Sequence, residues 1–291
     1  MPSGTGFGKV ILFGEHFVVH GSPSIGLGIS RKTTVELKQS KSLKLWKGAS
    51  PRIREATQRI LERLGTERKY SVDVESELPA GAGLGWSASY SVALVRAAAK
   101  DLGSRLNDWK VAEFSYEGEK AFHGNPSGID NTLATYGGAL WFRRGFPHRR
   151  IPLGSKFHFL VSYTGKSGPT KELVAGVTSL KERMHSLFSH LMYAEGEVVK
   201  RGEAALSSGD AKSLGELMNV NHGLLSAVGV SSPEIEEIVA YARSGCGALG
   251  AKLTGAGGGG CAISLYSSAK AASSAEKKIG KKGYRSFTFS V

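Results

Sequence analysis

The stretch Glu77-Leu-Pro-Ala-Gly-Ala-Gly-Leu-Gly-Trp-Ser-Ala-Ser-Tyr-Ser-Val92 places three glycines directly before an Ala, Ser and Val run that is typical of a helix. Glycine lacks a Cβ atom, so Gly81, Gly83 and Gly85 can adopt left-handed conformations that turn several N–H groups toward one anion. The helix expected at about 87–102 adds unpaired first-turn N–H donors and the positive end of its dipole. The junction is therefore a candidate phosphate-binding loop, although a glycine loop alone is also typical of an ordinary strand-to-helix turn.

The composition indicates a folded protein with a basic surface. The chain has 291 residues, 41% of them hydrophobic, which suffices for one large domain or two of ordinary size. Lys and Arg (38) outnumber Asp and Glu (25), so nucleotides, phosphorylated metabolites and nucleic acid would all be attracted. The charge is spread along the chain without an Arg-rich arm or an aromatic RNA motif, which favours a solvated surface and no nucleic-acid partner.

Cysteine use and hydropathy favour a cytoplasmic location. The two cysteines, Cys246 and Cys261, have neither metal-site nor disulfide spacing. The apolar run at 10–13 is followed by Glu15 and His16 and lacks a basic leader, and no run of about 18 apolar residues occurs. We therefore expect no membrane partner.

Hydrophobic periodicity predicts a mixed α+β chain. Strands are expected at 9–13, 17–19, 33–37, 70–74, 139–143, 157–163, 251–253, 261–266 and 284–290. Helices are expected at 51–64, 87–102, 109–122 with Asp108 as cap, 170–206, 210–225, from 233 onward, and up to 281. Residues 123–131 are expected to form a polar turn, and the change in character after residue 155 predicts a domain boundary there.

Four clusters together resemble the signature of the GHMP kinase superfamily, which includes galactokinase, homoserine kinase, mevalonate kinase and phosphomevalonate kinase. They are 8–16 (Gly-Lys-Val-Ile-Leu-Phe-Gly-Glu-His), 79–89, 123–131 (His-Gly-Asn-Pro-Ser-Gly-Ile-Asp-Asn) and 252–261 (Lys-Leu-Thr-Gly-Ala-Gly-Gly-Gly-Gly-Cys). Residues 118–131 and 164–177 look like mevalonate kinases in particular. The resemblance covers nearly the whole chain, from residue 8 to about 265.

The resemblance implies a two-domain α+β GHMP kinase fold. Residues 1–155 would be similar to domain 2 of ribosomal protein S5 and carry the ATP and phosphate loop, and residues 156–291 would be ferredoxin-like, with the ligands in the cleft between. It also implies ATP-dependent phosphorylation of the 5-hydroxyl of (R)-mevalonate in the route to isoprenoids. ATP and Mg²⁺ are the implied cofactors, mevalonate the implied small-molecule partner, and a homodimer the assembly common in the family.

Phosphoryl transfer to an alcohol depends on positioning, on charge neutralisation and on a carboxylate near the hydroxyl. By resemblance, Asp130 is the candidate general base and Lys9 the paired cation. Ser87 and Glu119 match the residues that contact Mg²⁺, an ion that prefers oxygen ligands. On local sequence alone, Asp130 and Ser87 could equally be caps, and Lys9 and Glu119 surface residues.

The other assignments concern the nucleotide and the acceptor. Nucleotide contacts are expected from Pro79, Gly81, Gly83, Leu84, Gly85, Trp86, Ser87, Ala88 and Ser89. Acceptor contacts are implied for Glu15, His16, Tyr136, Thr170, Gly255 and Ala256. His16 could instead be an ordinary turn histidine, and the glycines at 255–260 a hairpin connection. His123 is interpreted as structural.

Two positions depart from the family pattern. Phe7 replaces the usual proline before Gly8, which removes a fixed φ angle without disturbing Lys9. Trp86 replaces the first of two serines in the loop, so this position supplies no hydroxyl, although its backbone N–H remains. We expect Trp86 to pack over the nucleotide or the loop and to change ATP affinity or purine preference.

Two alternatives remain open at this point. Another kinase of the superfamily, acting on phosphomevalonate or a sugar, would give His16 no role, and a phosphorylated substrate would need extra Arg or Lys facing Asp130. A catalytically impaired basic binding protein on the same scaffold is mildly favoured by Trp86. The joint presence of Lys9, Ser87, Glu119 and Asp130 argues against that second alternative.

Overall fold

The computed structural model describes residues 1–79, 81–123 and 126–291. Ala80 of the glycine loop and residues 124–125 of the expected polar turn therefore lie outside the described residues. The chain divides into two compact units that are not continuous in sequence. Unit 1 contains Met1–Lys9, Gly28–Ala80 and Gly85–Gly137, and unit 2 contains Val10–Leu27, Gly81–Leu84 and Gly138–Val291. The boundary expected near residue 155 falls inside unit 2 and stays a prediction.

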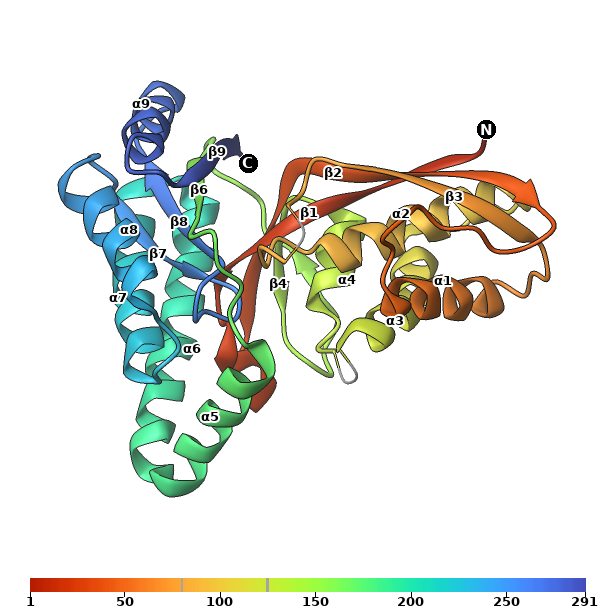
Figure 1. Ribbon diagram of the computed structural model, residues 1–291. Coiled ribbons are helices and arrows are strands. Elements are labelled where there is room, and N and C mark those ends of the chain that lie inside the picture. The colour runs from red at the N-terminus through yellow and green to blue at the C-terminus, as the bar shows by residue number, and fades with distance from the viewer. Residues whose placement is uncertain (80, 124–125) are drawn as a thin grey trace. The chain divides into compact units, whose positions relative to one another are not determined.

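Unit 1 combines long strands with helices that lie on one face of them (Figure 1). Its elements are β1 (Ser3–Phe13) and β2 (Ser24–Ser40), which both continue into unit 2, together with β3 (Lys69–Ser76), α1 (Pro51–Arg63), α2 (Trp86–Asp101), α3 (Asp108–His123) and α4 (Ile129–Tyr136). Strand β2 pairs with β1 and, antiparallel from Thr33 opposite Ser76 to Ser40 opposite Lys69, with β3.

The core of unit 1 lies between these strands and helices. It includes the buried side chains of Val35, Ile60, Tyr70, Tyr90 and Val95. Helix α2 is buried along most of its length because its Ala and Ser side chains are small. Its close packing on the strands fixes where the glycine loop enters the helix.

Unit 2 contains a four-stranded sheet of order β7-β8-β6-β9. Its elements are η1 (His16–His20), β4 (Ala139–Phe142), β5 (Arg149–Arg150), β6 (His158–Tyr163), α5 (Thr170–Arg183), α6 (His185–Ser208), α7 (Ala211–Ala227), α8 (Pro233–Ser244), β7 (Gly250–Thr254), β8 (Cys261–Tyr266), α9 (Ala269–Gly280) and β9 (Arg285–Ser290). Strand β6 pairs antiparallel with both β8 and β9, and β7 pairs antiparallel with β8. This strand order, with helices between β6 and β7 and between β8 and β9, is ferredoxin-like.

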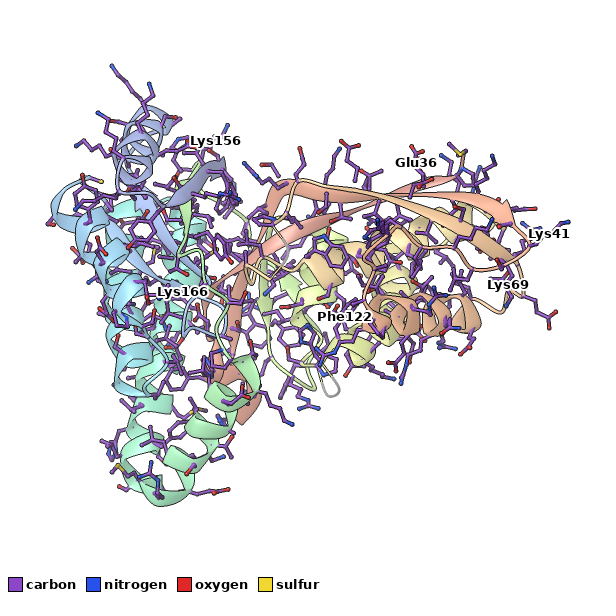
Figure 2. All side chains as sticks on the ribbon, in the orientation of Figure 1. Glu36, Lys41, Lys69, Phe122, Lys156 and Lys166 are labelled. Carbon is purple, nitrogen blue, oxygen red and sulfur yellow. The ribbon has the colours of Figure 1, made fainter. Side chains whose placement is uncertain are left out.

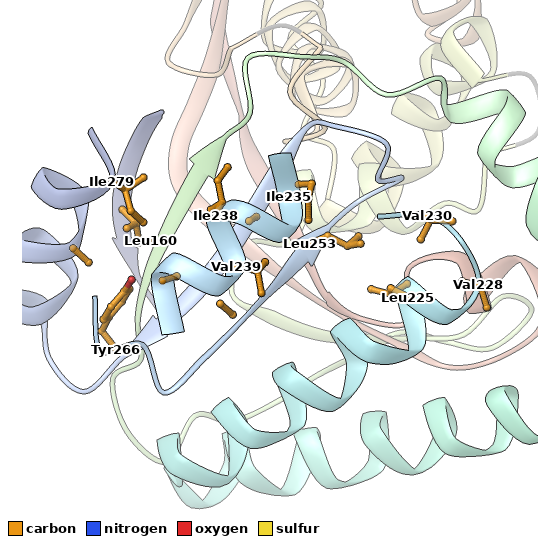
Figure 3. Close-up of a cluster of buried hydrophobic side chains, with 14 of the residues drawn as sticks. Leu160, Leu225, Val228, Val230, Ile235, Ile238, Val239, Leu253, Tyr266 and Ile279 are labelled. Carbon is orange, nitrogen blue, oxygen red and sulfur yellow. The ribbon is translucent and has the colours of Figure 1, made fainter. Parts of the chain in front are cut away.

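The core of unit 2 forms where α8 and α9 pack on this sheet. Figure 3 shows Leu160 of β6, Ile238 of α8, Leu253 of β7, Tyr266 of β8 and Ile279 of α9 directed into one cluster. Helix α8 begins cleanly because Pro233 occupies its first position and the Ser232 hydroxyl accepts from the backbone N–H of Ile235 (3.4 Å). The sheet therefore has a well-packed face that supports the glycine-rich connection between β7 and β8.

Most expected strands and helices are confirmed, although β1 and β2 begin six and nine residues earlier than expected, and the strand at 17–19 is wrong. These residues form η1, because the N–H of Val18 bonds back to the carbonyl of Gly14 (2.9 Å) and the chain turns again at Gly21. The expected polar turn is also wrong after Gly128, where α4 begins and includes Asp130 in its first turn. A hydrophobic alternation of three residues was too short to decide the first case.

Two helix ends also differ from expectation. The helix expected at 170–206 is interrupted at Met184, whose φ of −131° and ψ of 50° are not helical. Asp108 is the first residue of α3, and the cap is Asn107, whose Oδ1 accepts from the backbone N–H of Lys110 (2.9 Å).

Candidate functional site

Lys9 and Asp130 form an ion pair in unit 1. The Nζ atom of Lys9 lies 3.0 Å from Oδ2 of Asp130, and the two side chains are 6% and 29% exposed. Lys9 comes from β1 and Asp130 from the first turn of α4. The structure thus brings together the two residues expected to be catalytic, an ammonium beside a carboxylate that can accept a proton. Their catalytic roles stay predictions.

Gly85 permits this placement of Lys9. Its φ is 77°, in the left-handed region, and a Cβ atom there would lie 2.7 Å from Cγ of Lys9. Gly85 is also the residue before the first turn of α2. The aliphatic part of Lys9 therefore lies directly against the start of this helix.

The N-terminus of α2 is arranged to bind an anion. The carbonyl of Gly85 accepts from the N–H of Ser89 (2.9 Å), so the N–H groups of Trp86, Ser87 and Ala88 have no acceptor within the helix. No side chain of the described residues caps this end, and the first turn contains no acidic residue. The dipole of the 16-residue helix adds positive potential at the same place.

A buried carboxylate, Glu119, faces the same group of residues. Its side chain is 1% exposed, and neither oxygen has a hydrogen-bond partner among the residues that the structure describes. Burial, and then the charge of Asp130, raise the pKa of Glu119 to about 8, while Ser87 and Lys9 act in the opposite direction. The charged form of Glu119 is therefore unfavourable in this environment, and a bound cation would stabilise it.

Ser87 and Glu119 fit a divalent cation. A charged carboxylate that is buried without hydrogen-bond donors is unfavourable in free energy. Mg²⁺ typically binds one or two carboxylates and completes its coordination shell with waters and substrate phosphates. Within the described ranges, no group of three or more His, Cys, Asp or Glu is arranged to hold a metal. Binding of Mg²⁺ here would therefore rely on ligands from phosphate and water, and the metal role of both residues stays a prediction.

His123 belongs to this group as well, which the sequence did not suggest. Its Nε2 atom lies 3.3 Å from Oγ of Ser87 and 3.8 Å from Oε2 of Glu119. Burial lowers the pKa of His123. The available signal was the spacing of four residues between Glu119 and His123, which places both side chains on one face of a helix.

Trp86 packs within unit 1. Its indole stacks on the ring of Tyr90, one helical turn later, with centroids 5.4 Å apart and an interplanar angle of 2°. The rings of Trp46 and Phe122 meet it edge-on at 6.4 and 6.5 Å. The residue that replaces a family serine is thus part of an aromatic cluster at the start of α2, and its effect on nucleotide binding stays a prediction.

In unit 2, His16 presents a buried hydrogen-bond acceptor. Its Nε2 atom lies 2.7 Å from the carbonyl oxygen of Ala256. Because a carbonyl only accepts, Nε2 carries the proton and Nδ1 is left as the acceptor. Nδ1 is buried and has no hydrogen-bond partner in the described part of the chain. Burial lowers the pKa of His16 more than the Ala256 contact raises it, so the ring is neutral at pH 7.

The glycine cluster at 255–260 lies beside the part of the glycine loop that belongs to unit 2. Cys261 Sγ donates to the carbonyl of Ala82 (3.2 Å), and Ser167 Oγ donates to the carbonyl of Gly81 (3.1 Å). Positive φ angles occur at Gly255, Gly257, Gly258, Gly259 and Gly260. The cluster therefore connects two buried strands and also supports the glycine loop, so it is more than a flexible hairpin connection.

The remaining expected residues have varied positions. Tyr136 ends α4, Thr170 begins α5 at the surface, and Pro79 is exposed. Ser89 is fully buried, and its hydroxyl donates to the carbonyl of Gly6 (2.7 Å), which fastens α2 to β1. Leu84 and Ala88 are buried, whereas Gly83 is exposed. The ligand contacts expected of these residues stay predictions.

Comparisons with known proteins accord with this geometry. The model of the GHMP kinases N terminal domain matches residues 51–138, and the model of the GHMP kinases C terminal domain matches residues 203–285. The chain belongs to the GHMP kinase family. As a GHMP kinase it has the two-domain α+β fold expected from its four motifs, so that expectation is confirmed.

Curated relatives of this GHMP kinase include three archaeal mevalonate kinases. The relative from Pyrococcus furiosus is 38% identical over 88% of this chain and 86% of its own length. The relative from Aeropyrum pernix is 37% identical over 89% and 86%, and that from Methanothermobacter thermautotrophicus is 34% identical over 88% and 87%.

Solved structures show the same similarity. The L. major mevalonate kinase in complex with R-mevalonate has a TM-score of 0.90 and 34% identity, and the match covers 100% of this chain and 96% of that one. The Methanococcus jannaschii mevalonate kinase has a TM-score of 0.84 and 28% identity, with coverage of 98% and 96%. Among the described residues of this GHMP kinase, we find no helix with the length and hydropathy of a membrane span.

Proposed function

We propose that this chain transfers the terminal phosphoryl group of ATP to the 5-hydroxyl of (R)-mevalonate, giving 5-phosphomevalonate for isoprenoid synthesis. The mevalonate kinase names of its relatives support this assignment. The observation that carries it is the ion pair of Lys9 and Asp130, 3.0 Å apart, in the same unit as the N-terminus of α2, which no side chain of the described residues caps. An amine, a carboxylate and an anion-binding helix end are the parts that phosphoryl transfer to an alcohol needs.

In this mechanism, the oxygen of the 5-hydroxyl forms a bond to the γ-phosphorus of ATP. Asp130 accepts the proton that this hydroxyl loses. The bond between that phosphorus and the β,γ-bridging oxygen breaks, and ADP leaves with the electron pair. Lys9 offsets the negative charge on the acceptor oxygen and on the transferred group. Because Lys9 is 6% exposed, its charge is weakly screened by water.

The N–H groups of Trp86, Ser87 and Ala88 bind phosphate oxygens of ATP, assisted by the dipole of α2. Ser87 and Glu119 would hold Mg²⁺, which would neutralise phosphate charge when bound. Glu119 has both carboxylate oxygens without donors among the described residues, so it is suited to this role.

His16 orients the acceptor. Its Nδ1 atom accepts a hydrogen bond from the tertiary hydroxyl of mevalonate, because Nε2 is already bonded to the carbonyl of Ala256. The other acceptor residues are Glu15, Tyr136, Thr170, Gly255 and Ala256. We further propose a cytoplasmic homodimer without nucleic-acid or membrane partners.

The test is an ADP-release assay with (R)-mevalonate, phosphomevalonate, galactose and homoserine as separate acceptors. Turnover with mevalonate alone supports the proposal. Turnover with phosphomevalonate or galactose, and none with mevalonate, would show that the chain has the activity of another kinase of the family. A folded sample that binds ATP and turns over none of the four would favour a binding protein on a kinase scaffold. Asp130→Asn is the matched negative control.

A further inference from the structure

In unit 2, the acceptor residue Glu15 belongs to a group of buried polar side chains whose other members, Lys252, Glu195 and Asn221, have no part in the proposed mechanism. Lys252 of β7 is 0% exposed and donates to the carboxylate of Glu15, which is 1% exposed, and to the carbonyl of Leu253 (2.6 Å). Glu195 of α6 and Asn221 of α7 are also fully buried. Buried charges are expensive unless they are paired, so a group of this size needs a reason for its presence.

Glu195 is the member of this group that faces the backbone at Gly14. Its Oε2 atom accepts from Nδ2 of Asn221 (2.6 Å), and the N–H of Gly14 faces the same carboxylate and favours its charged form. Oε1 has no hydrogen-bond partner within the described ranges. A residue of α6 thereby reaches the turn that joins β1 to η1.

The backbone conformation of Gly14 determines the turn that contains Glu15 and His16. Its φ is 97°, and a Cβ atom there would lie 2.6 Å from Cα of Ser24, so the turn is tightly enclosed. Its carbonyl accepts from the N–H of Val18 (2.9 Å), which closes the turn around Glu15 and His16. The direction in which His16 leaves the backbone therefore depends on how Gly14 is held.

The buried group contains more negative than positive groups. Two carboxylates, Glu15 and Glu195, share one ammonium, that of Lys252. Burial, and then the charge of Glu15, raise the pKa of Glu195 to about 7, while Asn221, Lys252 and the Gly14 N–H lower it. Because its pKa is near 7, Glu195 is only partly charged at neutral pH, and its oxygens act in this group mainly as hydrogen-bond acceptors. An amide side chain can supply one such oxygen.

We propose that Glu195 is a positioning residue for the acceptor. Its carboxylate holds the backbone at Gly14 and Lys252 holds the side chain of Glu15, so that His16 directs Nδ1 at the substrate hydroxyl. The inference rests on the proposed function, because it assigns His16 to mevalonate. It extends that function to a residue on another helix, 179 positions later in sequence than His16.

The test compares Glu195→Ala with Glu195→Gln and with Glu197→Ala, a control on the same helix whose side chain is 37% exposed. For Glu195→Ala we expect the KM for mevalonate to rise by about tenfold or more, and the KM for ATP to change by less than about twofold. Glu195→Gln keeps an oxygen for Asn221 or Gly14 and should restore the KM to within about threefold of the parent value. Glu197→Ala should match the parent protein.

Several outcomes would overturn the inference. Equal increases in both KM values, or a lower melting temperature with unchanged KM values, would show that Glu195 serves packing alone. If Glu195→Ala does not fold, Asn221→Ala decides, because it removes the donor to Glu195 and should raise only the mevalonate KM. If the parent protein has no activity with mevalonate, the proposed function fails and this inference fails with it. Normal parent activity with an unselective Glu195→Ala refutes the positioning role alone.

Discussion

The ion pair of Lys9 and Asp130 can be tested by removing one charge at a time. The structure predicts that the two single substitutions lower the unfolding free energy by different amounts. At 3.0 Å, unit charges in an effective dielectric of about 20 attract by about 5 kcal/mol, a value that solvent access to Asp130 reduces. Lys9 is 6% exposed, so Asp130→Asn leaves an ammonium with little water, and we expect a loss of about 3 kcal/mol in unfolding free energy. Asp130 is 29% exposed and can be rehydrated, so Lys9→Met should cost about 1 kcal/mol.

The double variant removes both charges and should cost about 1 kcal/mol, which gives an interaction free energy of about 3 kcal/mol between the two side chains. Urea unfolding followed by tryptophan emission measures this cycle, since Trp46, Trp86 and Trp109 report on unit 1. In the same four proteins, kcat with mevalonate should fall by about a hundredfold or more in every variant.

Two results would refute this reasoning. Unfolding free energies that add to within about 0.5 kcal/mol would mean that the two charges do not interact in solution. A kcat for Asp130→Asn within about tenfold of the parent value would remove Asp130 as the proton acceptor, whatever the stability shows.

Three further predictions concern the acceptor, the metal and the aromatic cluster. Because burial lowers the pKa of His16 below its ordinary value of 6.5, the mevalonate KM should rise as pH falls and the ring gains a proton on Nδ1, with the midpoint of this rise below pH 6.5. His16→Asn should abolish this rise, and a rise whose midpoint lies above pH 6.5 would contradict the assignment. Ser87→Ala and Glu119→Gln should raise the Mg²⁺ concentration for half-maximal activity by about tenfold without changing the mevalonate KM; an unchanged Mg²⁺ titration would exclude both as ligands. Trp86→Ser should lower the unfolding free energy by about 1 to 3 kcal/mol through loss of the stacked ring and should change the ATP KM or the preference for ATP over GTP; unchanged nucleotide kinetics would confine this indole to packing.

The glycine loop and α2 could be predicted from sequence because their causes are local. Positive φ angles at Gly81, Gly83 and Gly85, and the helix start at Trp86, follow from residues next to one another. The pairing of Lys9 with Asp130 was not local, since 121 positions separate them, and only the family resemblance indicated it. No periodicity in the sequence could have given their separation.

Other features depended on packing that a single sequence does not reveal. Asp130 was expected in a turn because Gly128 and polar residues precede it, yet the buried side chains of Ile129 and Leu133 make the segment a helix. Glu195 lies in an amphipathic pattern as an ordinary polar residue, and its burial follows from α6 packing on α7. Lys252 stood in a quoted motif, but only the packed sheet makes it fully buried.

The basic residues that gave the chain its net charge of +13 lie mostly at the surface. Figure 2 shows Lys41, Lys69 and Lys156 extending away from the ribbon. Their positions fit a solvated surface, and the charge that matters for the proposed chemistry is the single ammonium of Lys9.

Gly85 has a consequence for variation of this protein. Its backbone angle excludes most side chains, and the nearby Lys9 stem excludes any atom where a methyl group would be. A substitution that relieved one restriction would still violate the other, so a compensating change elsewhere would have to correct conformation and clearance together. In a saturation library selected for activity, this codon should therefore return to glycine almost without exception.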